Sequence, residues 1–339
     1  MRATGGTAFV TGGSGVVGRP VIAALRARGR SVIALARSEA ARRTVAGLGA
    51  TAVPGDIMDE SALAEAMRGS TAVFHVAGAN AFCVRDPSDM YRINVLGARN
   101  VVRAAAGAGV PLVVHTSSGA AIGERRGSVG TENTPHRGHY LSHYERSKHE
   151  AEMTVLAEAD ATGVDVVCVN PSSVQGPGRG QGTARLLRLF LDGKLRVFVD
   201  STVSLVDIDD CARGHVLAEE HGRPGERYIL SGATLRTADL VALLGRIAGV
   251  GGDVATIPAP AARAGAALVE LCARAARREP PVCRETMRVL LHGHAYDGSR
   301  AARELGLVYT PIEDTLRRTA QWLLQEGLVT RPLPGLSSP

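Results

Sequence analysis

The sequence predicts an α/β fold in which a doubly wound parallel sheet adjoins a smaller, mostly helical C-terminal region. From residue 7 to about residue 169, short β-branched runs alternate with amphipathic helical segments, which is the pattern of consecutive βαβ units. Some of these runs are apolar throughout, as at residues 166–169, and such strands suit a sheet that helices cover on both faces. With 339 residues, the chain is long enough to bury a substantial core.

The first half of the chain supplies the elements of this sheet. The runs read as buried strands, and the segments between them place apolar residues at helical spacing. The expected strands are residues 7–11, 31–36, 51–54, 72–76, 112–116 and 165–170, and the expected helices are residues 17–28, 39–48, 59–68, 90–107 and 143–162.

A glycine-rich turn at residues 11–18 connects the first strand to the first helix. Gly12 permits a sharp turn, Gly15 lets main-chain amides approach a pyrophosphate, and Gly18 lets the helix pack closely on the strand. The N-terminus of the helix adds partial positive charge. We interpret the turn as the phosphate-binding turn of a Rossmann domain, with contacts from Gly12, Ser14, Gly15, Val16 and Val17.

The end of the second strand bears on the choice of cofactor. A carboxylate here would accept hydrogen bonds from the ribose hydroxyls of NAD, whereas this chain has Arg37 followed by Ser38. A cation and a hydroxyl suit the 2′-phosphate of NADP, which a carboxylate would repel. The sequence therefore predicts NADP(H) rather than NAD(H). The alternative is that Arg37 is an ordinary surface arginine.

Tyr144 and Lys148 are four residues apart on an expected helix, so their side chains emerge on one face. A nearby ammonium lowers the pKa of a phenol from its usual value of about 10, and the phenol can then exchange a proton with a substrate oxygen. Ser118 follows the strand at residues 112–116, where its hydroxyl could hold the same oxygen. We expect these three residues to be catalytic, with Ser118 and Tyr144 also touching the substrate and Tyr144 and Lys148 also contacting the cofactor.

The pattern is looser after Pro171. A glycine-rich connection at residues 176–182 precedes expected helices at residues 183–191, 237–248, 261–278 and 312–326, with a strand at 227–231 that could rejoin the sheet. Asp209 and Asp210 are expected to be N-cap residues of a further helical stretch. The predicted division is a Rossmann domain at residues 1–170 to which residues 197–232 return, a substrate-binding region at 171–196 and 233–330, and a disordered tail at 331–339.

Composition limits the possible partners and location. The net charge is +6, but the arginines are scattered and no long run of like charge appears, which argues against a nucleic-acid partner. The longest apolar segment, residues 258–272, contains two charges and is too short to span a bilayer.

The start of the chain and its cysteines bear on location. The chain runs straight into a strand, so no signal peptide is expected, and its five cysteines are widely spaced. We expect a cytoplasmic protein in a reducing compartment, without a membrane or metal partner, whose cysteines are small buried hydrophobic residues.

Several motifs carry a resemblance to a known family. They are residues 11–18, 56–57, 75–78, 116–118, 144–148 and 170–177, together with Asn94. On these motifs the chain resembles the extended short-chain dehydrogenases/reductases of the NAD(P)-dependent epimerase/dehydratase superfamily. Residues 144–148, 225–232 and 297–301 make it similar, within that superfamily, to dihydroflavonol-4-reductase-like proteins. The resemblance spans about residues 7–330.

The resemblance implies further roles. Asp56 and Ile57 would hold the adenine, Val76, Ala77 and Gly78 would line the cofactor, and Pro171, Ser173 and Val174 would border the nicotinamide. Asn94 would lie beneath the active site and order a water, or it would only cap local backbone. Phe82 would face the substrate, or it would be buried core. The resemblance also implies a homodimer in which two helices per subunit, at residues 90–107 and 143–162, form a four-helix bundle.

Departures from the family's patterns narrow the chemistry. Sugar-nucleotide dehydratases carry an Asp-Glu pair directly after the position of Ser118, and sugar 4-epimerases usually carry Thr or Ser two places after it. This chain has Gly119 and Ala120 there, so both sugar chemistries lose support. Relatives often have His or Tyr at Asp207, and the sequence offers no account of that change.

Together these features predict an NADP-dependent oxidoreductase that reduces a ketone or aldehyde, or oxidises the matching alcohol, on a small and fairly apolar substrate. The substrate region is rich in Ala, Leu and Val. Its helix at residues 261–278, with Leu268, Leu271 and Cys272 on the apolar side, is expected to pack in the core or as a lid. Alternatively, it forms an apolar wall of the site. Two other functions remain open: a sugar-nucleotide epimerase with tightly bound NAD(P), and a non-catalytic NADP-binding regulatory protein.

Overall fold

A computed structural model describes residues 5–180, 182–251 and 254–336. Its main feature is a seven-stranded parallel sheet with the strand order β11-β7-β5-β4-β1-β2-β3, which confirms the predicted α/β class. The strands are β1 (Thr7–Thr11), β2 (Ser31–Ala36), β3 (Thr51–Pro54), β4 (Ser70–His75), β5 (Leu112–Thr116), β7 (Asp165–Pro171) and β11 (Arg227–Leu230). The late strand β11 rejoins the sheet beside β7.

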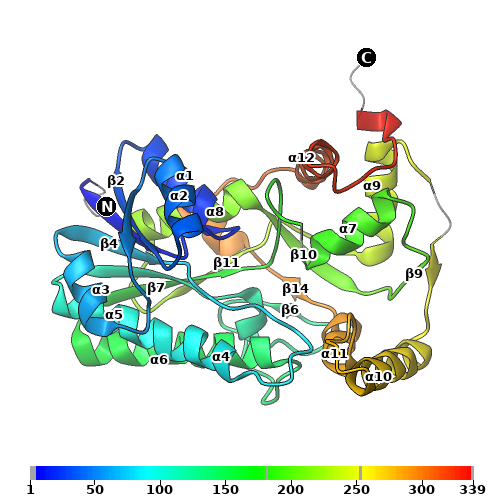
Figure 1. The fold of residues 1–339 in the computed structure, drawn as a ribbon, viewed down its shortest axis with the longest axis horizontal. Coiled ribbons are helices and arrows are strands. Elements are labelled where there is room, and N and C mark those ends of the chain that lie inside the picture. The colour runs from blue at the N-terminus through cyan, green and yellow to red at the C-terminus, as the bar shows by residue number, and fades with distance from the viewer. Residues whose placement is uncertain (1–4, 181, 252–253, 337–339) are drawn as a thin grey trace.

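Helices cover both faces of this sheet (Figure 1). One face carries α1 (Gly18–Ala27), α2 (Glu39–Gly47) and α8 (Ile208–His221), and the other carries α3 (Glu60–Met67), α5 (Gly97–Gly107) and α6 (His143–Thr162). Neighbouring residues of β1 point to opposite faces, because Val10 packs with Ile22 of α1 whereas Phe9 packs with Met67 of α3. Burial on both faces explains why runs such as residues 166–169 of β7 are apolar throughout.

The C-terminal half forms a smaller mixed region. A three-stranded sheet of β12 (Ala233–Arg236), β10 (Thr202–Asp207) and β8 (Ser173–Gln175) shares a core with α7 (Thr183–Leu191), α9 (Thr237–Ala248) and α12 (Ile312–Gln325). Two further helices, α10 (Ala259–Ala275) and α11 (Arg284–His292), pack together around Ala266 and Met287. Two short strand pairs complete this region: β9 (Val197–Phe198) with β13 (Ala255–Thr256), and β6 (Val129–Gly130) with β14 (Ala295–Tyr296).

The helix expected at residues 90–107 is interrupted. It begins as α4 (Ser88–Tyr91), passes through the π-helical turn η1 (Arg92–Leu96) and continues as α5. Other short turns are the 3-10 turns η2 (Gly119–Ile122) and η4 (Pro334–Leu336) and the π-helical turn η3 (Ala301–Leu305). Helix α11 was not expected, because its sequence is mostly polar and charged.

Asp207, rather than Asp209 or Asp210, is the N-cap of α8. Its carboxylate accepts a 2.8 Å hydrogen bond from the Asp209 amide. The same carboxylate accepts hydrogen bonds from the Thr315 hydroxyl (2.7 Å) and the Arg318 guanidinium (2.5 Å) of α12. The prediction that Asp209 and Asp210 are N-cap residues was therefore wrong. Asp207, for which the sequence offered no role, connects β10, α8 and α12.

Three further expectations need correction. The tail expected to be disordered is ordered as far as it is described: Leu333 is buried in the core that contains α9, and residues 337–339 lie outside the described residues. Cys83 and Cys283, expected as simple buried hydrophobic residues, form a disulfide, which also removes the cysteine-based argument for a reducing compartment. On α10, Leu268 and Leu271 are exposed rather than packed in the core, because the buried side of that helix carries Ala262, Ala266 and Glu270.

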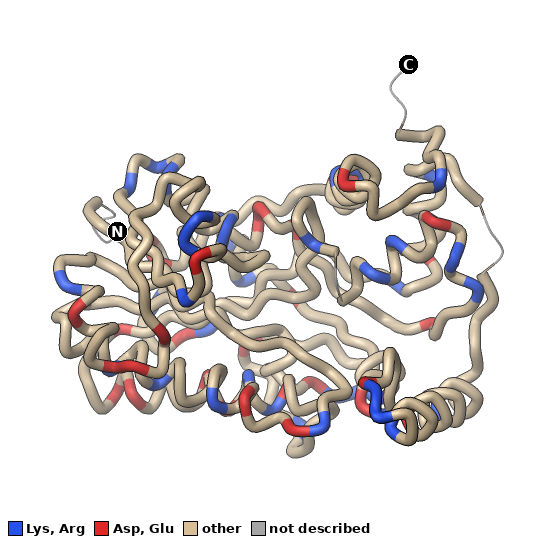
Figure 2. Tube along the Cα trace, in the orientation of Figure 1, with Lys and Arg blue, Asp and Glu red and all other residues tan. Residues whose placement is uncertain are grey.

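Charges of both signs are spread along the chain rather than segregated by region (Figure 2). Among the described residues, no helix is long and apolar enough to cross a membrane.

Candidate active site

The glycine-rich turn closes against the end of β4. Gly12 has a φ of +70°, and a Cβ atom there would lie 2.5 Å from the main-chain nitrogen of Ala77. A Cβ atom on Gly18 would lie 2.1 Å from the carbonyl oxygen of Gly12, so both positions require glycine. Ser14 and Gly15 are exposed at the tip of the turn, before the N-terminus of α1, whose first turn holds no acidic residue. This cradle of backbone amides fits the pyrophosphate of a dinucleotide.

Arg37 lies directly after β2 with its side chain 73% exposed. Its acidic neighbour is Asp56, at an Nη1–Oδ2 distance of 3.8 Å, so the guanidinium is held only loosely. The Ser38 hydroxyl caps α2 by accepting a hydrogen bond from the Ala41 amide (3.2 Å). Ile57 is buried with its side chain against α5. The cofactor roles of Arg37, Asp56 and Ile57 stay predictions.

Ser118, Tyr144 and Lys148 come together where β5 meets α6. Lys148 Nζ donates a 2.6 Å hydrogen bond to the carbonyl oxygen of Thr116, the last residue of β5. The Ser118 hydroxyl lies close enough to the Tyr144 hydroxyl to lower the pKa of Tyr144. Helix α6 has the expected bounds and begins after Ser142, whose hydroxyl accepts a hydrogen bond from the Glu145 amide (3.0 Å). The structure therefore assembles the three residues that the sequence singled out.

Burial controls the titration of this group. It raises the pKa of Tyr144 above its ordinary value, against the opposing effects of the nearby Ser118 hydroxyl and the Arg179 charge. Burial also lowers the pKa of Lys148 to about 8, against the opposing Glu152 carboxylate. Arg179 is the cation whose charge lowers the pKa of Tyr144 in this arrangement. The same role for Lys148 stays a prediction.

Arg179 was missed by the sequence analysis. It lies in the glycine-rich connection after β8, and its Nε is buried without a hydrogen-bond partner. Burial lowers the pKa of Arg179, and the nearby Tyr144 and Cys211 oppose that shift. A lone arginine within a run of glycines was the available signal, because such a segment can bend a side chain back toward the site.

Asn94, in η1, fastens the loop after β4 to the catalytic helix. Its side chain accepts a hydrogen bond from the Ala79 amide (2.7 Å) and donates to the Ala79 carbonyl (2.9 Å) and the Ser147 hydroxyl (2.8 Å). The interpretation of Asn94 as a cap of local backbone is therefore wrong, because its partners lie 15 and 53 positions away in the chain. Its ordering of a water stays a prediction. A Cβ atom on Gly78 would lie 3.3 Å from Asn94 Oδ1 and 3.6 Å from Lys148 Nζ. Because Gly78 has no side chain, Asn94 and Lys148 can both lie close to its backbone.

The remaining residues predicted to line a cofactor lie at the same edge of the sheet. Val76 and Ala77 donate main-chain hydrogen bonds to the carbonyl and hydroxyl of Thr11, at 3.2 Å and 3.3 Å. Pro171 ends β7, and Ser173 and Val174 open β8, with the Ser173 hydroxyl donating to that of Thr183 (2.9 Å). Their contacts with a nicotinamide stay predictions.

Phe82 borders the catalytic tyrosine. It is 38% exposed, and its ring centroid lies 5.9 Å from that of Tyr144, so the alternative of a buried core residue is wrong. The next residue, Cys83, is bonded to Cys283. Glu285 accepts hydrogen bonds from the amides of Cys83 (2.9 Å) and His143 (2.7 Å). One carboxylate of α11 thus holds the Phe82 loop and the start of α6 together.

Three buried histidines, which the sequence analysis also missed, lie under Lys148. Burial and the Lys148 charge lower the pKa of His75 to about 3 and that of His215 to about 4, and they lower the pKa of His115 well below its usual value. These rings are therefore neutral at neutral pH. The hydroxyls of Thr11 and Thr116 hydrogen-bond to His75 (2.7 Å) and His215 (2.9 Å), which fixes the strand ends that support the site.

Comparison with known proteins agrees with this geometry. The family described as "NAD dependent epimerase/dehydratase family" matches residues 8–231. This chain belongs to that family, the extended short-chain dehydrogenases/reductases. Membership implies an NAD(P) cofactor and an enzyme that acts on a carbonyl group or its alcohol.

Individual relatives cover nearly the whole chain. A Synechocystis sp. protein named "Putative dihydroflavonol 4-reductase" is 32% identical over 331 residues, with 95% of each chain covered. The 2-alkyl-3-oxoalkanoate reductase of Stenotrophomonas maltophilia is 32% identical over 330 residues, covering 91% of this chain and 97% of the relative. The crystal structure of gox2253 superposes with a TM-score of 0.84 at 33% identity, covering 96% of this chain and 99% of that one.

Proposed function

We propose that this extended short-chain dehydrogenase/reductase is an NADP(H)-dependent reductase of a ketone or aldehyde, also able to oxidise the matching alcohol. The observation that carries the proposal is that Ser118, Tyr144 and Lys148 meet at the same sheet edge as the dinucleotide cradle. NADPH, when bound, supplies the hydride. Loosely held Arg37 supports the choice of NADP over NAD, since its guanidinium could pair with a 2′-phosphate.

Each residue of the group has a role in the proposed reaction. Ser118 donates a hydrogen bond to the substrate carbonyl oxygen, and Tyr144 gives that oxygen its proton. Burial raises the pKa of Tyr144, so its hydroxyl is protonated at neutral pH and can give its proton to the substrate oxygen. Arg179 and Lys148 supply positive charge that stabilises the phenolate left after proton transfer.

The surroundings favour an apolar substrate. Exposed Phe82 offers an aromatic face next to Tyr144. A relative matched over 97% of its length is named a 2-alkyl-3-oxoalkanoate reductase, which supports a carbonyl substrate with an apolar chain. A sugar 4-epimerase is less favoured, because Ala120 supplies no hydroxyl and its amide instead donates to Ser118 Oγ (3.2 Å). An epimerase would also retain its nucleotide through gel filtration, whereas a reductase should release it.

We also propose a homodimer formed through α5 and α6. Exposed Leu96 at the start of α5 and exposed Met153 on α6 offer apolar contacts for a second copy. Sedimentation of the purified protein tests this, and a monomer at micromolar concentration would contradict it.

The test of the reaction is loss of NADPH absorbance across a panel of ketones and aldehydes that includes alkyl 3-oxo acids. On any substrate found, Tyr144→Phe should lower kcat by about 10²- to 10⁴-fold, because the proton donor is lost. NADPH binding, followed by fluorescence, should be unchanged. Full turnover by this variant would overturn the proposed role of Tyr144.

A further inference from the structure

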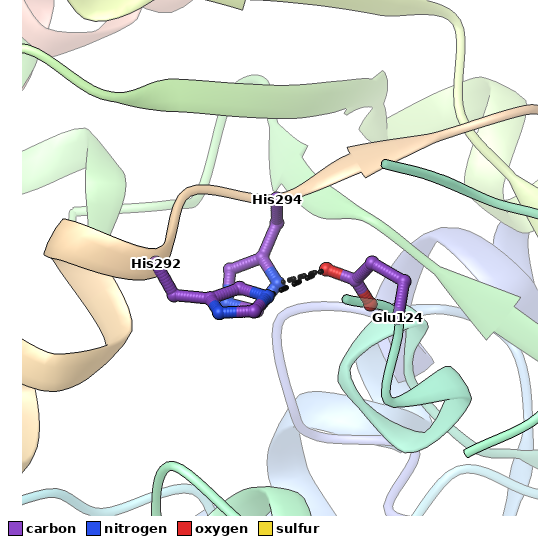
Figure 3. A group of neighbouring side chains, drawn as sticks. All are labelled: Glu124, His292 and His294. Carbon is purple, nitrogen blue, oxygen red and sulfur yellow. Dashed lines mark hydrogen bonds and ion pairs between the residues drawn. The ribbon is translucent and has the colours of Figure 1, made fainter. Parts of the chain in front are cut away.

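Two histidines and a glutamate from distant parts of the chain converge outside the proposed catalytic group (Figure 3). Glu124 follows the 3-10 turn η2, which starts directly after Ser118. His292 ends α11, and His294 lies just before β14. One side-chain ligand atom from each of the three residues lies within 4.8 Å of the others.

The backbone at Gly293 turns both imidazoles toward the carboxylate. Gly293 has a φ of +71°, and a Cβ atom there would lie 2.9 Å from Ser201 Oγ and 3.1 Å from the Thr202 nitrogen. The amide of His294 donates a 2.8 Å hydrogen bond to the Thr202 carbonyl, which fixes it against β10. The two rings therefore lie on one side, with their centroids 5.1 Å apart.

Polar atoms in this cluster are buried without partners. Glu124 is fully buried, and its Oε1 accepts a 2.6 Å hydrogen bond from His294 Nδ1 and lies 3.6 Å from His292 Nε2. Glu124 Oε2 and His292 Nε2 have no hydrogen-bond partner in the described part of the chain. Native proteins rarely leave such atoms unsatisfied, and a bound ion is one of the recognised explanations.

We propose that Glu124, His292 and His294 bind a divalent cation of the zinc type. Two imidazole nitrogens and one carboxylate oxygen form a ligand set that zinc takes in proteins, at about 2.0–2.2 Å from each atom. Magnesium and calcium prefer oxygen ligands and do not suit this site. Binding replaces the Nδ1 proton of His294, which moves to Nε2 of the same ring or to solvent. A water molecule fills the fourth position.

Neighbouring residues surround the three proposed ligands. The Tyr296 hydroxyl lies 3.0 Å from His294 Nδ1, where it can hold the metal-bound water or orient the ring. His292 also lines a cavity of about 450 Å³ whose walls include Leu141, Leu291 and the four arginines Arg126, Arg263, Arg284 and Arg288. The ion would join the segment that follows Ser118 to the end of α11 and the start of β14. We therefore assign it a stabilising role between the Rossmann sheet and the C-terminal region.

The test is titration of chelator-treated, full-length protein with zinc chloride, followed by calorimetry and thermal unfolding. The wild type should bind one zinc ion per chain and unfold at a higher temperature with zinc, because the ion binds only the folded protein. His292→Gln and His294→Gln should each weaken binding by about 100-fold or more, since loss of outer-sphere partners alone costs about 10- to 100-fold. His139→Gln, at an exposed histidine outside the cluster, is the matched control and should bind like the wild type.

X-ray absorption of the zinc-loaded wild type keeps the proposal testable if a variant fails to fold. It should show only nitrogen and oxygen neighbours, with the scattering of two imidazoles. A sulfur neighbour would overturn the proposal, because it would assign the zinc to a cysteine such as exposed Cys272. The proposal would also be overturned if both histidine variants fold and still bind zinc. The same holds if zinc does not change the unfolding temperature of the wild type.

Discussion

Lys148 donates a 2.6 Å hydrogen bond to the main-chain carbonyl of Thr116, and this bond fastens the catalytic helix α6 to the end of β5. The strand that leads to Ser118 and the helix that carries Tyr144 are thereby held in one relative position. The ammonium is buried, which lowers its pKa to about 8, so the bond and its charge depend on pH near the physiological range.

The pH dependence of the reaction should follow from these pKa values. Reduction requires protonated Tyr144, whose pKa burial raises, and charged Lys148, whose pKa is about 8. The kcat/KM for carbonyl reduction should therefore be constant through neutral pH and fall above about pH 8 as Lys148 loses its proton. Steady-state profiles measure this, and Lys148→Met should lack the decline near that pH. A rate that falls on acidification from pH 7 to 6 would contradict the assignment.

Arg179 should set the alkaline behaviour of Tyr144. Its charge lowers the tyrosine pKa, so Arg179→Gln should raise that pKa further. In the direction of alcohol oxidation, which needs the phenolate, the rising limb of the pH profile should move to higher pH. Arg185→Gln, at an exposed arginine of α7, is the control. Identical profiles for the two variants would exclude a role for Arg179 at the tyrosine.

Arg37 should determine the preference for NADPH. Its replacement by serine removes the cation expected to meet the 2′-phosphate, and hydrogen bonds to charged groups contribute about 1.5–3 kcal/mol. The KM for NADPH should rise by about 10- to 100-fold while the KM for NADH changes little. Kinetics with both cofactors measure this, with Arg68→Gln as a surface control. An equal loss with NADPH and NADH would refute selective recognition of the phosphate.

The disulfide between Cys83 and Cys283 should stabilise the substrate side of the protein. It joins residues 200 positions apart, and disulfides typically contribute about 2–4 kcal/mol to the free energy of unfolding. Cys283→Ser should lower the unfolding temperature and raise the KM for the substrate, because Phe82 adjoins Cys83. Cys272→Ser, at an exposed free cysteine, should change neither.

Thiol counting checks the bond itself. Denatured, unreduced protein should expose the three free thiols of Cys168, Cys211 and Cys272. Five reactive thiols in freshly purified protein would show that the bond is absent.

Local patterns were enough to predict the sheet and the catalytic group. Strands β1, β2, β3 and β5 and the helix α6 have the expected bounds. The strands are marked by short runs of β-branched and apolar residues, and α6 by its N-cap Ser142 and its C-terminal Gly163. The relationships that complete the site are not local. Glu285 and Arg179 reach the site from segments whose own composition is polar or glycine-rich, and no periodicity marks the approach of Cys283 to Cys83. Buried His75 and His115 likewise look like ordinary polar interruptions until the fold places them under Lys148.

The most direct test of the central claim is to follow deuterium from NADPH labelled at the transferable position of its nicotinamide ring. With a carbonyl substrate found in the panel, the labelled hydrogen should appear on the carbinol carbon of the product, in one stereochemical sense, with one NADPH consumed per product. Turnover that consumes no NADPH and returns the label to the cofactor would contradict a reductase and point to an epimerase.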